Sequence, residues 1–267
     1  MPIAECKDID IYYELHGSGF PVAFISGLGA GTWAWETQVP FFSRRYQMTT
    51  FDNRGAGRSS APPGPYSIEQ MALDTVRLLY TLDIEELFVV GLSMGGMIAQ
   101  ELALILPHRV RGMVLAATHP GGDLRISGPQ DVYQRLMDNS GLSPDEIVDK
   151  NIPILFSPES VTNRPKLIQA YRERQKDIPL QPEHAFAAQQ RAIQGFDCSA
   201  KLNKIQAPTL LLAGEDDQLI PAENAQRMAE HIPNSRVKIL PQAGHLIHME
   251  QMEEFNQTLH EFFQAKL

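Results

Sequence analysis

The sequence has little cysteine. Among its 267 residues there are two cysteines, Cys6 and Cys198, and neither belongs to a C-x-x-C pair. Two cysteines are too few for a disulfide framework, so a reducing, cytoplasmic setting is expected. Cysteines and histidines with metal-ligand spacing are also missing from the sequence, so no metal site is expected.

Long apolar runs and an excess of positive charge are missing as well. No stretch reaches the length of about 18 apolar residues that a membrane helix needs. The N-terminus has no basic region followed by an apolar run, so no signal peptide is expected. The 32 Asp and Glu residues outnumber the 23 Lys and Arg residues and give a net charge of -9. This balance disfavours nucleic acid or an anionic membrane as a partner.

The first half of the chain alternates short apolar runs with amphipathic stretches. Helices are expected over 67–81, where Ser67 and Gln70 resemble a capping box, and over 94–106. The apolar runs are expected to be strands and lie at 11–15, 22–26, 47–51, 87–90 and 114–117. The later runs are apolar on both faces, as in buried parallel strands. The alternation predicts an α/β fold with a parallel, doubly wound sheet.

The pattern changes between residues 121 and 200. This segment contains helical stretches broken by prolines and no convincing buried strand. Strands and helices resume at 208–213, 222–231, 237–240 and 249–263. We therefore expect a core domain made of residues 1–120 and 201–267, interrupted by a helical insertion at 121–200.

The strongest functional signal is the segment from Gly91 to Gly95, which matches G-x-S-x-G with Ser93 at its centre. It lies between an apolar strand and a helix, the context that a nucleophile turn requires. Such a turn is tight, so its neighbours must be small, and Gly91, Gly95 and Gly96 meet that need. Ser93 is therefore the predicted nucleophile. The alternative is a glycine-rich turn with a solvent-facing serine.

A serine hydroxyl needs a base. His245 lies in a loop just after a late strand, beside Gly244, which we expect to let the loop turn back over the strand ends. His248 is the alternative base. His119 follows the strand at 114–117 and is a candidate pocket residue, while surface positions are expected for His16, His108, His184, His231 and His260.

The histidine needs an acid that fixes its tautomer. The acidic residues of Gly214-Glu215-Asp216-Asp217 follow an apolar strand, which gives the chain order Ser, Asp, His. We favour Asp217 over Asp216, and Asp123 is a weaker candidate.

An oxyanion hole needs two N–H donors. Met94 follows the nucleophile, and Leu28 lies in the glycine-rich loop after the strand at 22–26, so their backbone N–H groups are the candidates. The alternative for these glycines is a dinucleotide-binding fingerprint, with Gly27-Leu28-Gly29 after one strand and Asp52 at the end of the next strand. It is disfavoured because Thr32 stands where the third glycine should be.

Five motifs in order resemble the α/β-hydrolase superfamily, in particular its esterase, enol-lactonase and cofactor-free haloperoxidase branch. The motifs are Ser26-Gly27-Leu28-Gly29, Phe51-Asp52-Asn53-Arg54-Gly55-Ala56-Gly57-Arg58-Ser59, Gly91-Leu92-Ser93-Met94-Gly95-Gly96, Gly214-Glu215-Asp216-Asp217 and Ala243-Gly244-His245. The resemblance implies the α/β-hydrolase fold, with a mostly parallel sheet of about eight strands and a helical insertion after the sixth strand. It also implies Asp217 as the acid, and an insertion that acts as a cap and shapes substrate choice. It gives the segment at 52–59 no catalytic role.

This chain departs from many relatives at Ser26, where a histidine is common; the change removes a side chain that often packs under the loop. The nucleophile is a serine, so the chemistry of relatives with an aspartate there, such as haloalkane dehalogenases and epoxide hydrolases, is disfavoured.

The expected activity is hydrolysis of a small-molecule carboxylic ester or lactone through an acyl-enzyme on Ser93, without a cofactor. One alternative is a carbon–carbon bond hydrolase of the same superfamily. Another is a small-molecule-sensing binding protein with an intact but slow triad. Position alone suggests four pocket residues: Trp33, His119, Leu219 and Leu246.

Overall fold

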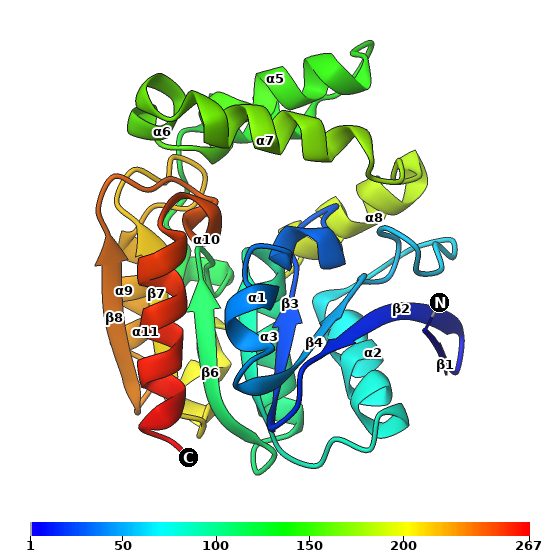
Figure 1. Cartoon of the computed structure of the whole chain (residues 1–267), viewed down its shortest axis with the longest axis vertical. Helices are drawn as coiled ribbons and strands as arrows, with labels where there is room; N and C mark the ends of the chain where they lie inside the picture. The colour runs from blue at the N-terminus through cyan, green and yellow to red at the C-terminus, as the bar shows by residue number, and fades with distance from the viewer. Residues whose placement is uncertain (1) are drawn as a thin grey trace.

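The computed structural model describes residues 2–267 and contains one eight-stranded sheet (Figure 1). The strand order is β1-β2-β4-β3-β5-β6-β7-β8. β1 and β2 are antiparallel to their neighbours, and all pairings from β4 to β8 are parallel. The strands are β1 (Ile3–Cys6), β2 (Ile9–His16), β3 (Phe20–Ile25), β4 (Tyr46–Phe51), β5 (Leu87–Leu92), β6 (Val110–Ala116), β7 (Thr209–Gly214) and β8 (Ser235–Leu240). The predicted mostly parallel sheet of about eight strands is confirmed, although β1 was not predicted.

Helices cover both faces of the sheet. The α-helices are α1 (Val39–Phe42), α2 (Ile68–Thr81), α3 (Met94–Ile105), α4 (Gln130–Met137), α5 (Pro144–Leu155), α6 (Pro158–Asn163), α7 (Pro165–Lys176), α8 (Glu183–Gln194), α9 (Glu223–Ala229), α10 (Ile247–Glu250) and α11 (Met252–Gln264), and the 3-10 helices are η1 (Thr32–Trp35), η2 (Gly122–Leu124) and η3 (Ser199–Lys204). The expected start of α2 is present, because the Ser67 side chain accepts a hydrogen bond from the Gln70 N–H. Among the described residues, no helix is both long and apolar enough to cross a membrane.

The two faces of the sheet bury separate apolar cores. Along β3, Ala23 and Ile25 belong to the core that contains α2 and α3, whereas Val22 and Phe24 belong to the core that contains α11. This alternation follows the two-residue period of a strand. Helices cover both faces of the sheet. In open α/β sheets, ligands bind outside the carboxyl ends of the strands, beside the loops that follow them.

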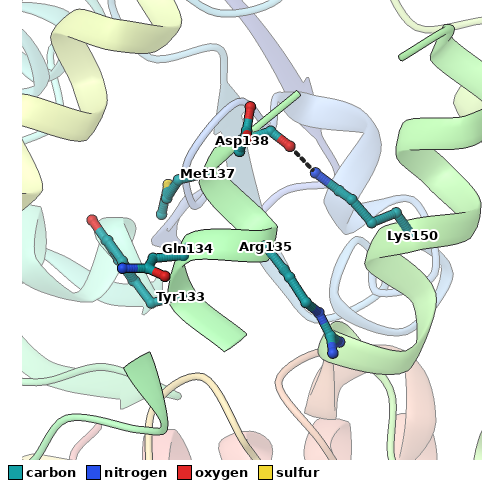
Figure 2. A pocket seen from close by; sticks show the side chains of 6 residues that line it. All are labelled: Tyr133, Gln134, Arg135, Met137, Asp138 and Lys150. Carbon is teal, nitrogen blue, oxygen red and sulfur yellow. Dashed lines mark hydrogen bonds between the residues drawn. The ribbon is translucent and has the colours of Figure 1, made fainter. Parts of the chain in front are cut away.

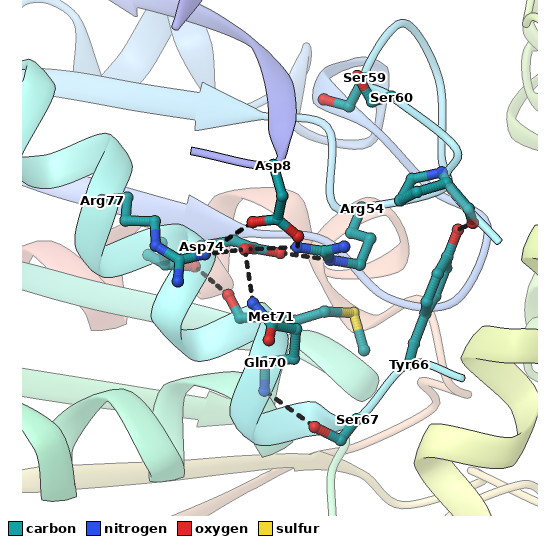
Figure 3. A network of polar contacts seen from close by, with 12 residues as sticks. Asp8, Arg54, Ser59, Ser60, Tyr66, Ser67, Gln70, Met71, Asp74 and Arg77 are labelled. Carbon is teal, nitrogen blue, oxygen red and sulfur yellow. Dashed lines mark hydrogen bonds and ion pairs between the residues drawn. The ribbon is translucent and has the colours of Figure 1, made fainter. Parts of the chain in front are cut away.

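A buried ion pair fixes the loop after β4. The Arg54 Nε lies 2.7 Å from Asp74 Oδ2 on α2, and its Nη2 lies 3.2 Å from Asp8 in the β1–β2 turn (Figure 3). The side chains of Arg54 and Asp74 are almost inaccessible to water, so this pair is screened far less than an exposed one. The loop after β4 is therefore held firmly at the edge of the sheet where the candidate site lies.

The helices α4 to α8 all fall between β6 and β7 in the chain. In Figure 1, α5, α6 and α7 lie beyond the arrowheads of the parallel strands. α5 begins with a complete capping box between Ser143 and Glu146, and it packs on α7 through an apolar cluster of Ile152, Phe156 and Ile168. The predicted helical segment after the sixth strand is thus present.

Candidate active site

Ser93 occupies the turn between β5 and α3. Its backbone has φ 56° and ψ -119°, a conformation that costs energy for a residue with a side chain. A Cβ on Gly91 would lie 2.3 Å from the Gly95 carbonyl oxygen, and a Cβ on Gly95 would lie 2.0 Å from that of Ile25. Neither position can hold a larger residue. Gly91 and Gly95 are required because neighbouring backbone atoms lie too close for a side chain.

Neighbouring backbone and one threonine hold this turn in place. The Ser93 N–H donates to the Ala116 carbonyl at 2.9 Å, and the Ser93 carbonyl accepts a hydrogen bond from the Thr118 hydroxyl at 2.7 Å. Thr118 was not predicted, because nothing local in the sequence marks it. The Ser93 side chain is partly exposed and lies against Gly27, whose missing Cβ would be 3.3 Å from the Ser93 Cβ.

His245 and Asp217 form a buried pair. The His245 Nδ1 lies 2.8 Å from Asp217 Oδ2, and the two residues are 4% and 5% exposed. The other oxygen, Asp217 Oδ1, accepts the N–H groups of Leu219 and Ile220, both at 2.9 Å. A carboxylate only accepts hydrogen bonds, so with an ionised Asp217 this bond requires the proton on His245 Nδ1. The Nε2 of the neutral ring is then left as an acceptor.

The three residues follow strands whose carboxyl ends share one edge of the sheet. Ser93 follows β5, Asp217 follows β7 and His245 follows β8. The predicted nucleophile, acid and base are therefore carried to the edge where ligands bind in open α/β sheets.

A buried glutamate, which was not predicted, shapes the His245 loop. Glu250 Oε1 accepts the Gly244 N–H at 2.7 Å, and its Oε2 accepts the N–H and the hydroxyl of Ser157 at 2.8 and 2.7 Å. A Cβ on Gly244 would lie 2.7 Å from the Ser157 nitrogen. The reason for glycine at position 244 is thus close approach to the segment between α5 and α6, rather than the turn freedom expected.

The alternative base and acids occupy other environments. His248 is fully buried, its Nε2 lies 3.1 Å from the Ala34 carbonyl oxygen, and its ring packs on Trp35. Asp216 is half-buried, and its N–H donates to the Ala243 carbonyl. Asp123 is exposed on η2. His245 is paired with Asp217 alone among these acids within residues 2–267.

The glycine-rich loop after β3 lies beside Ser93. The Ser26 hydroxyl donates to the Gly31 carbonyl at 2.9 Å and ties the two ends of the loop together. This bond gives Ser26 a structural role in the loop. Within residues 2–267, the N–H groups of Leu28 and Met94 donate to no acceptor, so both remain available to a ligand.

The Asp52 carboxylate holds the end of this loop through hydrogen bonds from backbone N–H groups. Asp52 Oδ1 accepts the Thr32 N–H at 2.7 Å, and Oδ2 accepts the Arg58 N–H at 2.8 Å. With both oxygens used by backbone groups, Asp52 has a structural role, and its contacts do not support the dinucleotide alternative.

Comparison with known proteins decides the family. Residues 21–251 match the family described as alpha/beta hydrolase fold. The chain belongs to this family. The predicted resemblance and fold class are thereby confirmed.

Individual α/β hydrolases match over nearly the whole chain. "Putative carbamate hydrolase RutD" of Azorhizobium caulinodans is 31% identical over 97% of both chains. A thermophilic esterase from Thermogutta terrifontis is 30% identical with a TM-score of 0.82, covering 96% of this chain and 94% of its own. The enol-lactonase from Burkholderia xenovorans is 25% identical with a TM-score of 0.86, covering 98% of this chain and 100% of its own.

The four suggested pocket residues of this α/β hydrolase lie in different surroundings. Trp33 is half-buried against the α11 core. Leu219 is half-buried and donates its N–H to Asp217. Leu246 packs on the apolar cluster of α5 and α7, and His119 is buried at 2% exposure.

An open pocket of about 720 Å³ lies apart from these residues, on the surface of the helical segment. It is lined by Tyr133, Gln134, Arg135, Met137, Asp138 and Lys150 (Figure 2). None of the predicted catalytic or pocket residues lines it, so this cavity gives no support to the suggested pocket.

Two buried histidines should make stability depend on pH. Burial lowers the pKa of His119 and of His248 from 6.5 to about 3 in each case, with the nearby Arg125 also acting on His119. The unfolded chain binds protons at these residues below pH 6.5 while the folded protein does not, so stability present above pH 6.5 is lost as the pH falls toward 3. We expect the free energy of unfolding in urea to fall by about 4 kcal/mol between pH 7 and pH 5.

Substitution should separate the contributions. His248→Gln removes one titrating group, so about half of the pH-dependent loss should disappear. His184 is exposed, and His184→Gln should leave the loss unchanged. An identical pH dependence in wild type and His248→Gln would contradict the assignment.

Proposed function

We propose that this α/β hydrolase is a serine hydrolase that cleaves a small-molecule carboxylic ester or lactone, with Ser93 as nucleophile, His245 as base and Asp217 as acid. The observation that carries the proposal is the buried hydrogen bond of 2.8 Å between His245 Nδ1 and Asp217 Oδ2. It sets the histidine tautomer needed to accept a proton, at the same sheet edge as the strained Ser93 turn.

In the proposed reaction, the Ser93 Oγ attacks the carbonyl carbon while His245 Nε2 takes the hydroxyl proton. The backbone N–H groups of Leu28 and Met94 stabilise the oxyanion of the tetrahedral intermediate. His245 then gives its proton to the leaving oxygen, which leaves an acyl group on Ser93. A water molecule activated by His245 hydrolyses that ester and restores the enzyme. No cofactor takes part.

The proposal divides the chain into a core of residues 1–120 and 201–267 and a cap of residues 121–200. Two contacts support the boundary: Gly121 and Asp197 form an isolated antiparallel bridge, and the Cys198 N–H donates to the Pro120 carbonyl at 2.8 Å. The two ends of the inserted segment therefore lie side by side, close to where the chain leaves β6. The cluster of Ile152, Phe156 and Ile168 gives the segment an apolar centre, on which Leu246 and Met249 of the core also pack.

The reaction class can be tested with a substrate panel. Purified wild-type protein is assayed with p-nitrophenyl esters, lactones, aryl carbamates and a vinylogous diketone. Turnover of esters or lactones, lost in Ser93→Ala, would support the proposal. Turnover of the diketone alone would favour the carbon–carbon bond hydrolase instead. Ligand binding with no measurable turnover would favour the sensing protein.

The cap should select the substrate. Phe186 on α8 lies near the oxyanion loop, since a Cβ on Gly29 would be 3.9 Å from its ring. One methylene in an apolar pocket changes discrimination by about 10–200-fold. We therefore expect Phe186→Ala to change the ratio of kcat/KM for long and short acyl esters by at least about tenfold. The rate at which a small fluorophosphonate labels Ser93 should stay within a few-fold of wild type. A folded Phe186→Ala protein that is acylated by none of the substrates would contradict the prediction.

A further inference from the structure

Helix α8 places a glutamine against the oxyanion loop. Gln189 is fully buried. Its Oε1 accepts the Gly29 N–H at 3.0 Å, and its Nε2 donates to the Arg54 carbonyl at 2.7 Å. Gly29 directly follows Leu28. A side chain from the proposed cap thus bonds to the peptide next to a proposed oxyanion donor.

We propose that Gln189 is a positioning residue for the oxyanion hole, so that the seating of α8 on the core determines how well the Leu28 N–H stabilises the transition state. The inference rests on the proposed function. It assigns Gln189 no contact with reacting atoms, since its amide is already used by backbone groups of the core.

The Leu28–Gly29 peptide has little freedom once this bond is made. A peptide unit is planar, so fixing the Gly29 N–H also fixes the direction of the Leu28 carbonyl. Gly29 has a φ of +69°, and a Cβ there would lie 3.0 Å from the Gln181 Oε1. Gln181 also donates to the Gln189 Oε1 at 3.0 Å. The loop therefore reaches α8 through a backbone conformation at Gly29 that favours glycine. If the Leu28–Gly29 peptide rotated away, the buried Gln189 Oε1 would lose the Gly29 N–H and keep only the Gln181 donor.

Within residues 2–267, the other hydrogen bonds of the loop are made to residues of the core. The Ser26 hydroxyl bonds to the Gly31 carbonyl, and the Thr32 N–H bonds to Asp52. At the other end of the Gln189 amide, Arg54 is fixed by its pair with Asp74 (Figure 3). Gln189 consequently links Arg54, which is paired with Asp74, to the Leu28–Gly29 peptide. In the part of the chain that the structure describes, this is the loop peptide that bonds to a cap side chain.

Removing the Gln189 amide should reduce kcat more than it changes KM. The oxyanion forms only in the transition state, so a misplaced donor weakens transition-state binding and leaves ground-state binding almost intact. Deleting an oxyanion donor costs about 100–1000-fold in kcat. Displacing one by loss of its support should cost less, about tenfold or more.

The test compares Gln189→Met with Gln190→Met. Gln190 is the next residue of α8, and its Nε2 bonds to Met137 within the cap, so its substitution perturbs the helix without touching the loop. With p-nitrophenyl butyrate, Gln189→Met should lower kcat about tenfold or more at nearly constant KM. It should slow fluorophosphonate labelling of Ser93 in parallel, and Gln190→Met should match wild type. A wild-type kcat in Gln189→Met, or an effect on KM alone, would overturn the inference.

Gln189→Glu decides the question if Gln189→Met does not fold. A protonated carboxyl can accept from Gly29 and donate to the Arg54 carbonyl, as the amide does, whereas the ionised form cannot donate. The ratio of its kcat to that of wild type should therefore rise as the pH falls, and a constant, low ratio would overturn the inference. If wild-type Ser93 is not labelled at all, the proposed function fails and this inference fails with it. Normal wild-type labelling with an unaffected Gln189 variant refutes the inference alone.

Discussion

Ser93→Ala should lose nearly all hydrolysis of a good ester substrate while the fold stays intact. The variant removes the hydroxyl oxygen that is proposed to form the acyl-enzyme, and the equivalent loss in a serine protease is on the order of a million-fold. The loss should be smaller with activated esters, whose uncatalysed hydrolysis is already fast. Residual turnover should reflect the Leu28 and Met94 N–H groups and substrate binding alone.

The free energy of unfolding should hardly change in this variant. The Ser93 side chain makes no hydrogen bond within residues 2–267, and the turn is held by backbone groups and Thr118. Alanine keeps the Cβ and the same backbone conformation, so the change should stay within about 0.5 kcal/mol. kcat/KM and urea unfolding are to be measured on the same preparations. Wild-type hydrolysis in a folded Ser93→Ala protein would reduce Ser93 to a turn residue.

The second large effect is expected at Asp217. In Asp217→Asn an amide NH2 group can face the His245 Nδ1, which then has to accept rather than donate. The proton moves to Nε2, where the histidine can no longer act as a base toward Ser93. In a serine protease this change costs about 10⁴-fold in kcat. A loss of similar size is expected here, with the fold retained, because an amide oxygen can still accept the N–H groups of Leu219 and Ile220.

Asp216→Asn is the matched control for Asp217→Asn. The two residues are adjacent and the substitution is the same, but the Asp216 side chain has no hydrogen-bond partner within residues 2–267. Its kcat should remain within about twofold of wild type, as for a surface substitution. If Asp216→Asn is the inactive protein and Asp217→Asn is active, the acid has been assigned one residue too late.

Local signals in the sequence predicted most of the sheet and led to the residues that are proposed to carry chemistry. The apolar runs at 87–90 and 114–117 correspond to β5 and β6, and the Ser67 cap begins α2 as expected. Ser93 was selected from the G-x-S-x-G match, His245 from its loop after a late strand, and Asp217 from the acidic segment after another strand, to which the family resemblance assigns the acid. Parallel strands bring their carboxyl ends to one edge. The order of strands and helices along the chain is therefore enough to predict which residues lie at the carboxyl ends of the parallel strands.

The supporting contacts could not be predicted in the same way. Gly29 and Gln189 are 160 residues apart, and Ser157 and Glu250 are 93 apart. Which side chains of the insertion meet the loops of the core depends on how α8 and the α5–α6 connection pack, and no short motif records that packing. For the same reason Gly244 was assigned to turn freedom, although its neighbour Ser157 leaves no room for a side chain.

Covalent labelling of Ser93 tests the account most directly. Serine is inert at neutral pH without a base, so reaction with a fluorophosphonate at one serine among many reports an assembled site. The wild-type protein is treated with the reagent and the modified peptide is located by mass spectrometry, beside His245→Ala. The account predicts modification at Ser93 and a strongly reduced rate in His245→Ala. Modification of other serines with Ser93 untouched, or labelling of Ser93 at the same rate without His245, would contradict it.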